Sequence, residues 1–154
     1  NVQGDEPLVD PYDIVRCIEL KKKKPEAVIN AFCWISNDED PTSVNIPKVI
    51  MSEAGKAIYM SRTPLPSFKD KNNAPLLYAK QVCIYAFNIN QLSKYIGFGR
   101  KSTLENHEDI EILRFLELGV DVFMYECSPG SLAVDVVEDV KKVEYALNKR
   151  SKND

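Results

Sequence analysis

The chain has 154 residues, of which 44% are hydrophobic and 28% charged, and its formal net charge is −3. This length suffices for one domain with a buried core, and the composition is that of an ordinary globular protein. The slight negative charge excludes the basic footprint of a nucleic-acid-binding domain. No apolar run approaches the roughly 20 residues that a transmembrane helix needs. We therefore expect a single domain, residues 1–154, with neither nucleic acid nor membrane as a partner.

The cysteines indicate a reducing compartment. Cys17, Cys33, Cys83 and Cys127 form no CxxC pair, and three of the four lie in apolar patterns typical of buried strands or helices. We predict free thiols in a cytoplasmic protein. The single histidine, His107, argues against a histidine-rich metal site or a Ser-His-Asp triad.

The first half of the chain predicts one helix and several strands. Asp10 followed by Pro11 is typical of a helix start, because aspartate caps the first turn and proline suits its first position. Residues 27–34 are almost continuously apolar, as in a strand that is covered on both faces. Two short runs, 49–51 and 56–60, flank a turn and predict a hairpin. A loop rich in proline and lysine follows over 64–75.

The second half alternates strands with helices. We predict a strand over 81–87 and a helix over 90–96. The sequence STLE at 102–105 matches a capping box and predicts a helix that ends at Gly119. A strand over 120–125 and a helix over 135–147 complete the chain. This alternation predicts a mixed α/β sheet that is partly antiparallel because of the hairpin.

Two aspartates at opposite ends of the chain are candidate metal ligands. Asp5 follows a strand and a glycine, at the edge of the sheet where α/β folds bind ligands. Asp135 follows the last strand and begins the final helix. Taken alone, Asp5 also fits a turn, and Asp135 with Glu138 fits a helix start. Magnesium takes one or two carboxylates plus substrate phosphates, so the two aspartates together indicate a magnesium site.

Other polar side chains are candidate substrate contacts. Arg62 precedes a Pro-Leu-Pro corner and would bind a carboxylate through two parallel hydrogen bonds, although a surface ion pair fits it equally well. Gln81 and Tyr85 point to one side of a strand. Gln3 suits a nucleotide contact or an edge strand. Glu111 is a further candidate, with exposed pairing to Arg114 as the alternative.

Six stretches of the chain carry a family resemblance when taken in order. They are 1–7 (NVQGDEP), 55–62 (GKAIYMSR, before Pro-Leu-Pro), 81–87 (QVCIYAF), 102–105 (STLE), 111–114 (EILR) and 134–139 (VDVVED). Together they resemble the CMP-Kdo synthetases (3-deoxy-manno-octulosonate cytidylyltransferases). The likeness runs over almost the whole chain, and its most specific part is NVQGDEP at the start.

This resemblance implies a fold and a reaction. The fold would be the Rossmann-like mixed sheet of nucleotide-sugar nucleotidyltransferases, with an antiparallel hairpin insertion. The anomeric hydroxyl of an eight-carbon ulosonic acid would attack the α-phosphate of CTP, giving a CMP-sugar for lipopolysaccharide synthesis and pyrophosphate. Mg²⁺ would be held by Asp5 and Asp135, Arg62 would hold the sugar acid, and Gln3 would lie at the nucleotide. The family is dimeric, so we expect a homodimer with residues 64–87 near the contact.

Three departures from the family's pattern suggest an altered sugar. Gln81 stands where the family usually has histidine, and Cys83 replaces the following glycine. Ile112 replaces a glutamine. The stretch 133–139 departs from the family's GVDTPED but keeps its aspartate. Because the first two changes fall on the sugar side, we expect Kdo or a variant such as 8-amino-Kdo as the substrate.

One element of the family has no counterpart in the sequence. Nothing in it resembles the loop with glycine, arginine and lysine that grips the CTP phosphates. We therefore interpret the chain as the C-terminal two-thirds of such an enzyme and expect it to be inactive alone. The alternative is a non-catalytic binding or dimerisation module that retains the fold.

Overall fold

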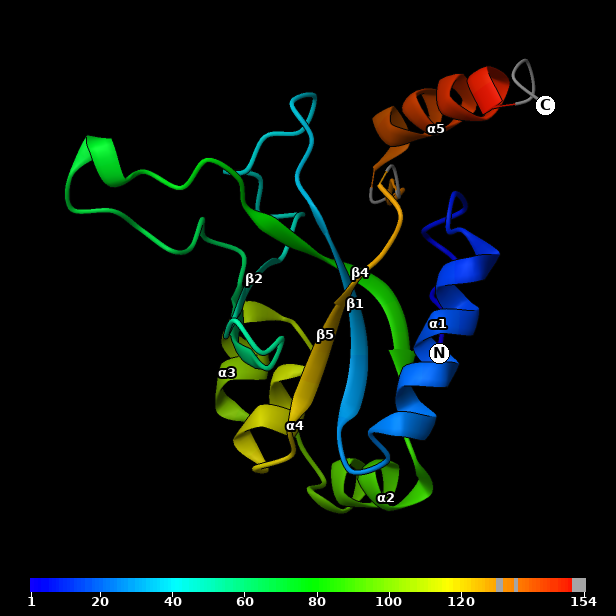
Figure 1. Cartoon of the computed structure of the whole chain (residues 1–154), viewed down its shortest axis with the longest axis vertical. Coiled ribbons are helices and arrows are strands. Elements are labelled where there is room, and N and C mark those ends of the chain that lie inside the picture. The colour runs from blue at the N-terminus through cyan, green and yellow to red at the C-terminus, as the bar shows by residue number, and fades with distance from the viewer. Residues whose placement is uncertain (130–131, 135, 151–154) are drawn as a thin grey trace.

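The computed structural model describes residues 1–129, 132–134 and 136–150, and it places helices on both faces of a mixed sheet (Figure 1). The strand order is β3-β2-β4-β1-β5, in which β1 and β5 run parallel and the other neighbours antiparallel. The predicted mixed α/β class and the antiparallel hairpin are therefore confirmed. The strands are β1 Val28–Trp34, β2 Lys48–Met51, β3 Ala57–Ser61, β4 Ala79–Ala86 and β5 Val122–Glu126.

Strand β1 is buried on both faces, as its apolar sequence predicts. Because successive side chains alternate, Val28 and Phe32 face one core cluster while Ile29 and Cys33 face the other. The first cluster joins the hairpin to the short helices of the second half. The second lies under helix α1, to which it is joined by Cys17.

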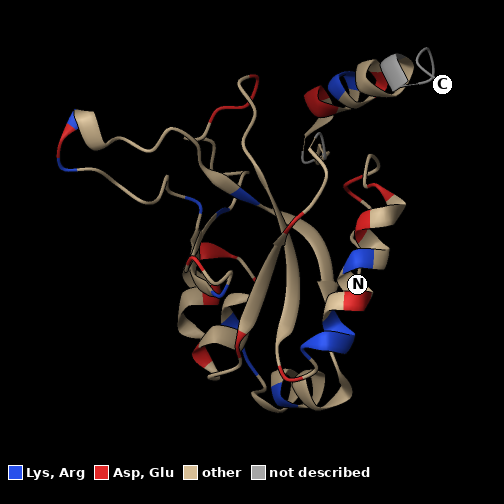
Figure 2. Cartoon of the chain, in the orientation of Figure 1, with Lys and Arg blue, Asp and Glu red and all other residues tan. Residues whose placement is uncertain are grey.

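Helix α1 (Pro11–Lys23) begins where the sequence predicts. The carboxylate of Asp10 accepts a hydrogen bond of 2.8 Å from the N–H of Tyr12, and Pro11 takes the first position. An acidic residue in the first turn and lysines in the last complement the helix dipole (Figure 2). Cys17 is buried against the sheet. Local sequence thus determines this helix and the face that it buries.

The predicted helix over 102–119 is wrong, because the chain breaks it in two. Helix α3 (Thr103–Glu108) ends at Asp109, whose φ of 51° is left-handed, and α4 (Leu113–Glu117) follows. The break lets Ile110 and Ile112 both be buried, at 2% and 3% exposure. The capping box of Ser102 is confirmed, since Glu105 accepts its backbone N–H at 2.9 Å.

The remaining elements shift only at their ends. Helix α2 (Ile89–Gly97) follows β4, and α5 (Val137–Arg150) closes the described chain. The short helix η1 (Lys71–Asn73) lies within the loop that joins β3 to β4, and Figure 1 shows this loop reaching away from the sheet. The four cysteines are free, with Cys83 half-buried and the other three buried. Among the described helices, none is both long and apolar enough to cross a bilayer.

Candidate functional site

Residues 1–3 pair with β4 through an isolated β-bridge at Val2. Asn1 and Tyr85 exchange two backbone hydrogen bonds, each of 2.8 Å, and the N–H of Gln3 donates to the carbonyl of Cys83 at 3.2 Å. The pairing is antiparallel to β4, as is that of β1. The segment therefore runs parallel to β1 and carries Asp5 toward the carboxyl end of the sheet, where such folds bind ligands.

The two ends of the chain meet at this edge. The N–H of Val134 donates a hydrogen bond of 2.8 Å to the backbone carbonyl of Asp5. Val134 immediately precedes Asp135, which lies outside the described residues. The structure thus brings the backbone that leads into one predicted metal ligand against the other, although about 130 residues separate them in sequence.

The carboxylate of Asp5 meets one requirement of a cation ligand. Its Oδ1 is buried, and no hydrogen-bond donor in the described part of the chain reaches it. A buried carboxylate oxygen without a donor is destabilising unless a cation or another donor completes its surroundings. Within the described residues, no group of three or more His, Cys, Asp or Glu side chains is arranged to hold a metal ion. The unpartnered Oδ1 of Asp5 fits Mg²⁺, which takes one or two carboxylates together with substrate oxygens.

Two side chains of β4, Cys83 and Tyr85, are kept uncharged chiefly by burial. Glu6 accepts the backbone N–H of Cys83 at 2.7 Å. Burial, together with the nearby charge of Glu6, raises the pKa of Cys83 to about 12. Burial also raises the pKa of Tyr85, with further contributions from Cys83 and from the negative charge of Glu111. Both groups are neutral near pH 7, so they are suited to hydrogen bonding rather than to nucleophilic attack.

Gln81 and Tyr85 lie on the same face of β4, as predicted. Gln81 donates from Nε2 to the Oδ1 of Asn30 at 3.0 Å, and the ring of Tyr85 stacks on Phe87 with centroids 5.9 Å apart. Glu111 is exposed between α3 and α4, near enough to Tyr85 to affect its pKa. The structure therefore brings Gln3, Gln81, Tyr85 and Glu111 to the neighbourhood of β4.

Arg62 lies in a different environment, at the end of β3. Its Nε donates to the carbonyl of Glu108 at 2.5 Å, and its two terminal nitrogens donate to the carbonyls of Val44 and Asp109 at 2.7 and 2.9 Å. Three of the five N–H groups of the guanidinium are thereby engaged. Arg62 thus joins two loops to the end of α3, and within the described residues its other two N–H groups have no hydrogen-bond partner.

Glu108 forms a second set of bonds around the same arginine. Its carboxylate accepts hydrogen bonds from Tyr59 (3.1 Å), Ser61 (2.7 Å) and the backbone N–H of Arg62 (2.8 Å). Burial acts to raise the pKa of Glu108, but these donors outweigh it and the pKa is lowered overall. The fully buried Lys48 also donates to the carbonyl of Arg62.

The alternative for Glu111, an exposed pairing with Arg114, is wrong. Arg114 is buried and binds Glu105 through two parallel hydrogen bonds of 2.6 Å. Its guanidinium also lies 3.7 Å from the ring centroid of Tyr95. The break between α3 and α4 produces this arrangement. In the sequence, Glu105 is the one residue that indicates this ion pair. Its position also fits a capping box, which by itself accounts for a glutamate there.

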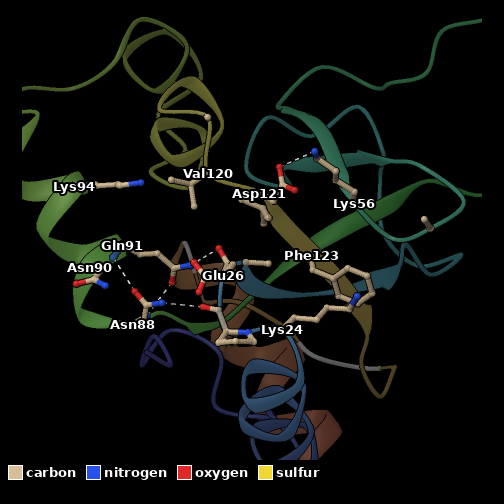
Figure 3. A pocket seen from close by; sticks show the side chains of 15 residues that line it. Lys24, Glu26, Lys56, Asn88, Asn90, Gln91, Lys94, Val120, Asp121 and Phe123 are labelled. Carbon is tan, nitrogen blue, oxygen red and sulfur yellow. Dashed lines mark hydrogen bonds and ion pairs between the residues drawn. The ribbon is translucent and has the colours of Figure 1, made fainter.

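A pocket of about 680 Å³ opens at the opposite end of the sheet, beyond the amino ends of β1 and β5 (Figure 3). Lys56 forms an ion pair of 2.6 Å with Asp121, and the ammonium of Lys24 lies 4.2 Å from the ring centroid of Phe123. Lys94 reaches the pocket from α2 and is exposed. These are ordinary surface cations, and the pocket is separate from the edge that carries Asp5.

Comparison with known proteins gives consistent results. A family model described as "Cytidylyltransferase" matches residues 1–122. A 3-deoxy-manno-octulosonate cytidylyltransferase from Koribacter versatilis is 35% identical over 98% of this chain and 56% of its own length. One from Thermodesulfovibrio yellowstonii is 33% identical over 96% of this chain and 59% of its own length.

A solved structure agrees with the fold. It is a CMP:2-keto-3-deoxy-manno-octonic acid synthetase complexed with CTP, which is 28% identical and superposes with a TM-score of 0.84. The match covers 97% of this chain and 61% of that protein. The chain thus spans a little over half the length of the relatives named above.

Proposed function

The chain belongs to the cytidylyltransferase family, and we propose that it forms the sugar- and metal-binding part of an enzyme that activates a 3-deoxy-ulosonic acid with CTP. The sugar would be Kdo or a variant such as 8-amino-Kdo, and the CMP-sugar would serve lipopolysaccharide synthesis in the cytoplasm. The observation that supports this proposal is the hydrogen bond between Val134 and Asp5, which joins the segment that bears Asp5 to the one that leads to Asp135.

In the proposed reaction, the anomeric hydroxyl oxygen of the sugar forms a bond to the α-phosphorus of CTP. The bond from that phosphorus to the bridging oxygen breaks, and the hydroxyl proton passes to solvent as pyrophosphate leaves. Asp5 and Asp135 would hold Mg²⁺, which when bound neutralises charge on the phosphates. The rest of the rate enhancement would come from positioning and electrostatics.

The protein's own side chains would orient the sugar. Neutral Tyr85 and the amide of Gln81 would hydrogen-bond the hydroxyl groups of the sugar. The exposed Glu111 would accept a hydrogen bond from another sugar hydroxyl. Arg62 would contact the sugar carboxylate through its two remaining N–H groups. Gln3 lies on the same segment as Asp5 and would contact the nucleotide.

A homodimer is part of this proposal. The loop between β3 and β4 exposes Leu76 at 99%, Leu77 at 52% and Phe68 at 44%, and it projects from the body of the protein (Figure 1). Apolar side chains displayed together on a projecting loop are typical of an interaction site. Sedimentation equilibrium should give twice the monomer mass, and Leu76→Asp should shift the equilibrium toward monomer.

The test is magnesium-dependent pyrophosphate release from CTP, measured with Kdo and with 8-amino-Kdo. Chain 1–154 is compared with any longer polypeptide encoded in frame upstream of Asn1, because the relatives named above are longer and we expect the chain alone to be inactive. Release that is lost in Asp5→Asn and Asp135→Asn supports the transferase, and the better sugar identifies the substrate. If the longer polypeptide is folded and releases no pyrophosphate with either sugar, the result would instead support a non-catalytic binding or dimerisation module.

A further inference from the structure

Asn30 is an unusual residue in the centre of β1. Its side chain is fully buried, and the other buried residues of this strand are apolar. Its Nδ2 donates two hydrogen bonds, of 2.9 Å to the carbonyl of Val82 and 3.0 Å to that of Ile84. A buried amide needs a hydrogen-bond partner for each polar atom, so the partners of Asn30 show which way its amide is turned.

The two carbonyls belong to an irregularity in β4. Asn30 pairs with Tyr85, but the next residue of β1, Ala31, pairs with Val82, so Cys83 and Ile84 are extra residues on β4. The same stretch receives residues 1–3, whose pairing carries Asp5 to the edge of the sheet. Asn30 therefore stabilises the part of β4 against which the metal-binding segment docks.

This arrangement dictates how the amide of Gln81 is oriented. Carbonyl oxygens only accept hydrogen bonds, so the nitrogen of Asn30 must face them and its Oδ1 must face Gln81. An oxygen needs a donor, so Gln81 must direct Nε2 toward it, as the 3.0 Å contact shows. The Oε1 of Gln81 then points away from Asn30. In the described part of the chain no hydrogen bond reaches this oxygen, and Gln81 is only partly buried.

We propose that Asn30 is a positioning residue that fixes the Oε1 of Gln81 on the side away from Asn30 and toward the sugar, so that the sugar group opposite this oxygen is a donor, a hydroxyl or an ammonium. The proposal rests on the proposed function, since it assigns Gln81 to the sugar side of that site. A glutamine free to rotate would offer either end of its amide to the sugar. With Nε2 held by Asn30, the position away from Asn30 is always occupied by Oε1, and the second N–H of Nε2 stays on the other side of the amide.

The fixed orientation of the Gln81 amide has a consequence for substrate choice. A hydroxyl both donates and accepts, so it tolerates either end of an amide, whereas an ammonium can only donate. Releasing Gln81 should therefore impair use of an amino sugar more than use of its hydroxyl counterpart. The ratio of kcat/KM for 8-amino-Kdo to that for Kdo is thus a readout that a general loss of folded protein does not change.

The experiment compares three variants in the pyrophosphate assay. Gln81→Met removes the acceptor and should lower kcat/KM for the preferred sugar at least about tenfold, with the KM for CTP unchanged. Gln81→His keeps a donor for Asn30 and an acceptor for the sugar, so it should lose about threefold or less. Asn30→Ala should lower the ratio for 8-amino-Kdo over Kdo about tenfold. Because this buried change risks unfolding, the two variants of the partly buried Gln81 keep the test decisive.

A second measurement does not depend on activity. In chain 1–154, nitrogen-15 NMR should show the Gln81 side-chain amide protected from hydrogen exchange, and Asn30→Ser should remove that protection. If Gln81→Met turns over both sugars like the parent, the inference is overturned and the transferase stands. If the Gln81 side-chain amide of unmutated chain 1–154 exchanges freely, Asn30 does not fix its orientation and the proposal is refuted. If no sugar binds or reacts, the transferase and the sugar-facing role of Gln81 are both refuted.

Discussion

Helix α3 and residues 1–6 each carry two buried or half-buried acidic side chains, but the carboxylates differ in how many hydrogen-bond partners they have. On α3, Glu105 binds Arg114 and Glu108 is surrounded by donors, so both carboxylates are satisfied within the protein. On the amino-terminal segment, Glu6 has a backbone partner, whereas the buried Oδ1 of Asp5 has no hydrogen bond within the described chain. The carboxylates of α3 support the fold, whereas the unpartnered oxygen of Asp5 is free to accept a bond from a ligand.

The strongest test of this contrast is Asp5→Asn. If Asp5 holds the metal, pyrophosphate release should fall on the order of 10³-fold, since metal stabilisation of the transition state contributes several kcal/mol. The melting temperature should stay the same or rise, because a buried negative charge is removed. Asp10→Asn is the matched control, because asparagine caps a helix as well as aspartate does. Equal activity in the two variants would remove Asp5 from the site.

Arg114→Ala should have the opposite profile. It leaves Glu105, whose exposure is 1%, charged without its partner, and should lower the free energy of unfolding by about 3–5 kcal/mol. Urea unfolding measures this loss. Arg100→Ala, at an exposed arginine, should cost less than about 1 kcal/mol. Similar losses in the two variants would show that the α3 network is not a source of stability.

Arg62→Lys examines a residue that supports the fold and is also proposed to contact the sugar. Lysine keeps the charge but loses the planar fork that reaches three carbonyls, so we expect a loss of about 1–3 kcal/mol in unfolding free energy. The KM for the sugar should also rise if the two remaining N–H groups bind its carboxylate. A stability loss with unchanged KM would assign Arg62 to the fold alone.

The carboxylates of α3 should make stability depend on pH. For both Glu105 and Glu108, burial raises the pKa but hydrogen-bond donors, chiefly Arg114 and the Arg62 N–H respectively, lower it overall. Their contribution is therefore complete above the unfolded value of about 4.3 and is lost as pH falls through the lower folded pKa. Urea unfolding between pH 7 and pH 3 should show this loss. Glu108→Gln should flatten the pH dependence, and an unchanged slope would contradict the assignment.

Lys56→Ala should have the smallest effect. The Lys56–Asp121 pair is close, at 2.6 Å, but both side chains are more than half exposed. Solvent screens such pairs, so thermal unfolding should show a change below about 1 kcal/mol, with no change in activity. A larger loss would mean that satisfaction of charges matters at the surface as well as within the α3 network.

Local sequence predicted the elements that depend on neighbouring residues. Asp10 and Pro11 begin α1, and Ser102 with Glu105 begins α3, because each cap is formed within a few residues. The apolar run of β1 predicted a strand that is buried on both faces. Family resemblance then indicated Asp5 and Asp135 as a pair, and the structure brings the segments that lead to them together at Val134.

Only the tertiary structure decided how polar side chains are used. Arg114 looked like a surface partner of Glu111, but the break at Asp109 turns it inward onto Glu105. Asn30 was a single polar residue in an apolar strand, and its partners lie more than 50 positions away. Hydrogen bonds between distant segments leave no periodic pattern in sequence, because they depend on which strands become neighbours. The sequence by itself determined most elements and the family, whereas the packing of the sheet decided where the chain breaks between α3 and α4 and which buried polar groups find partners.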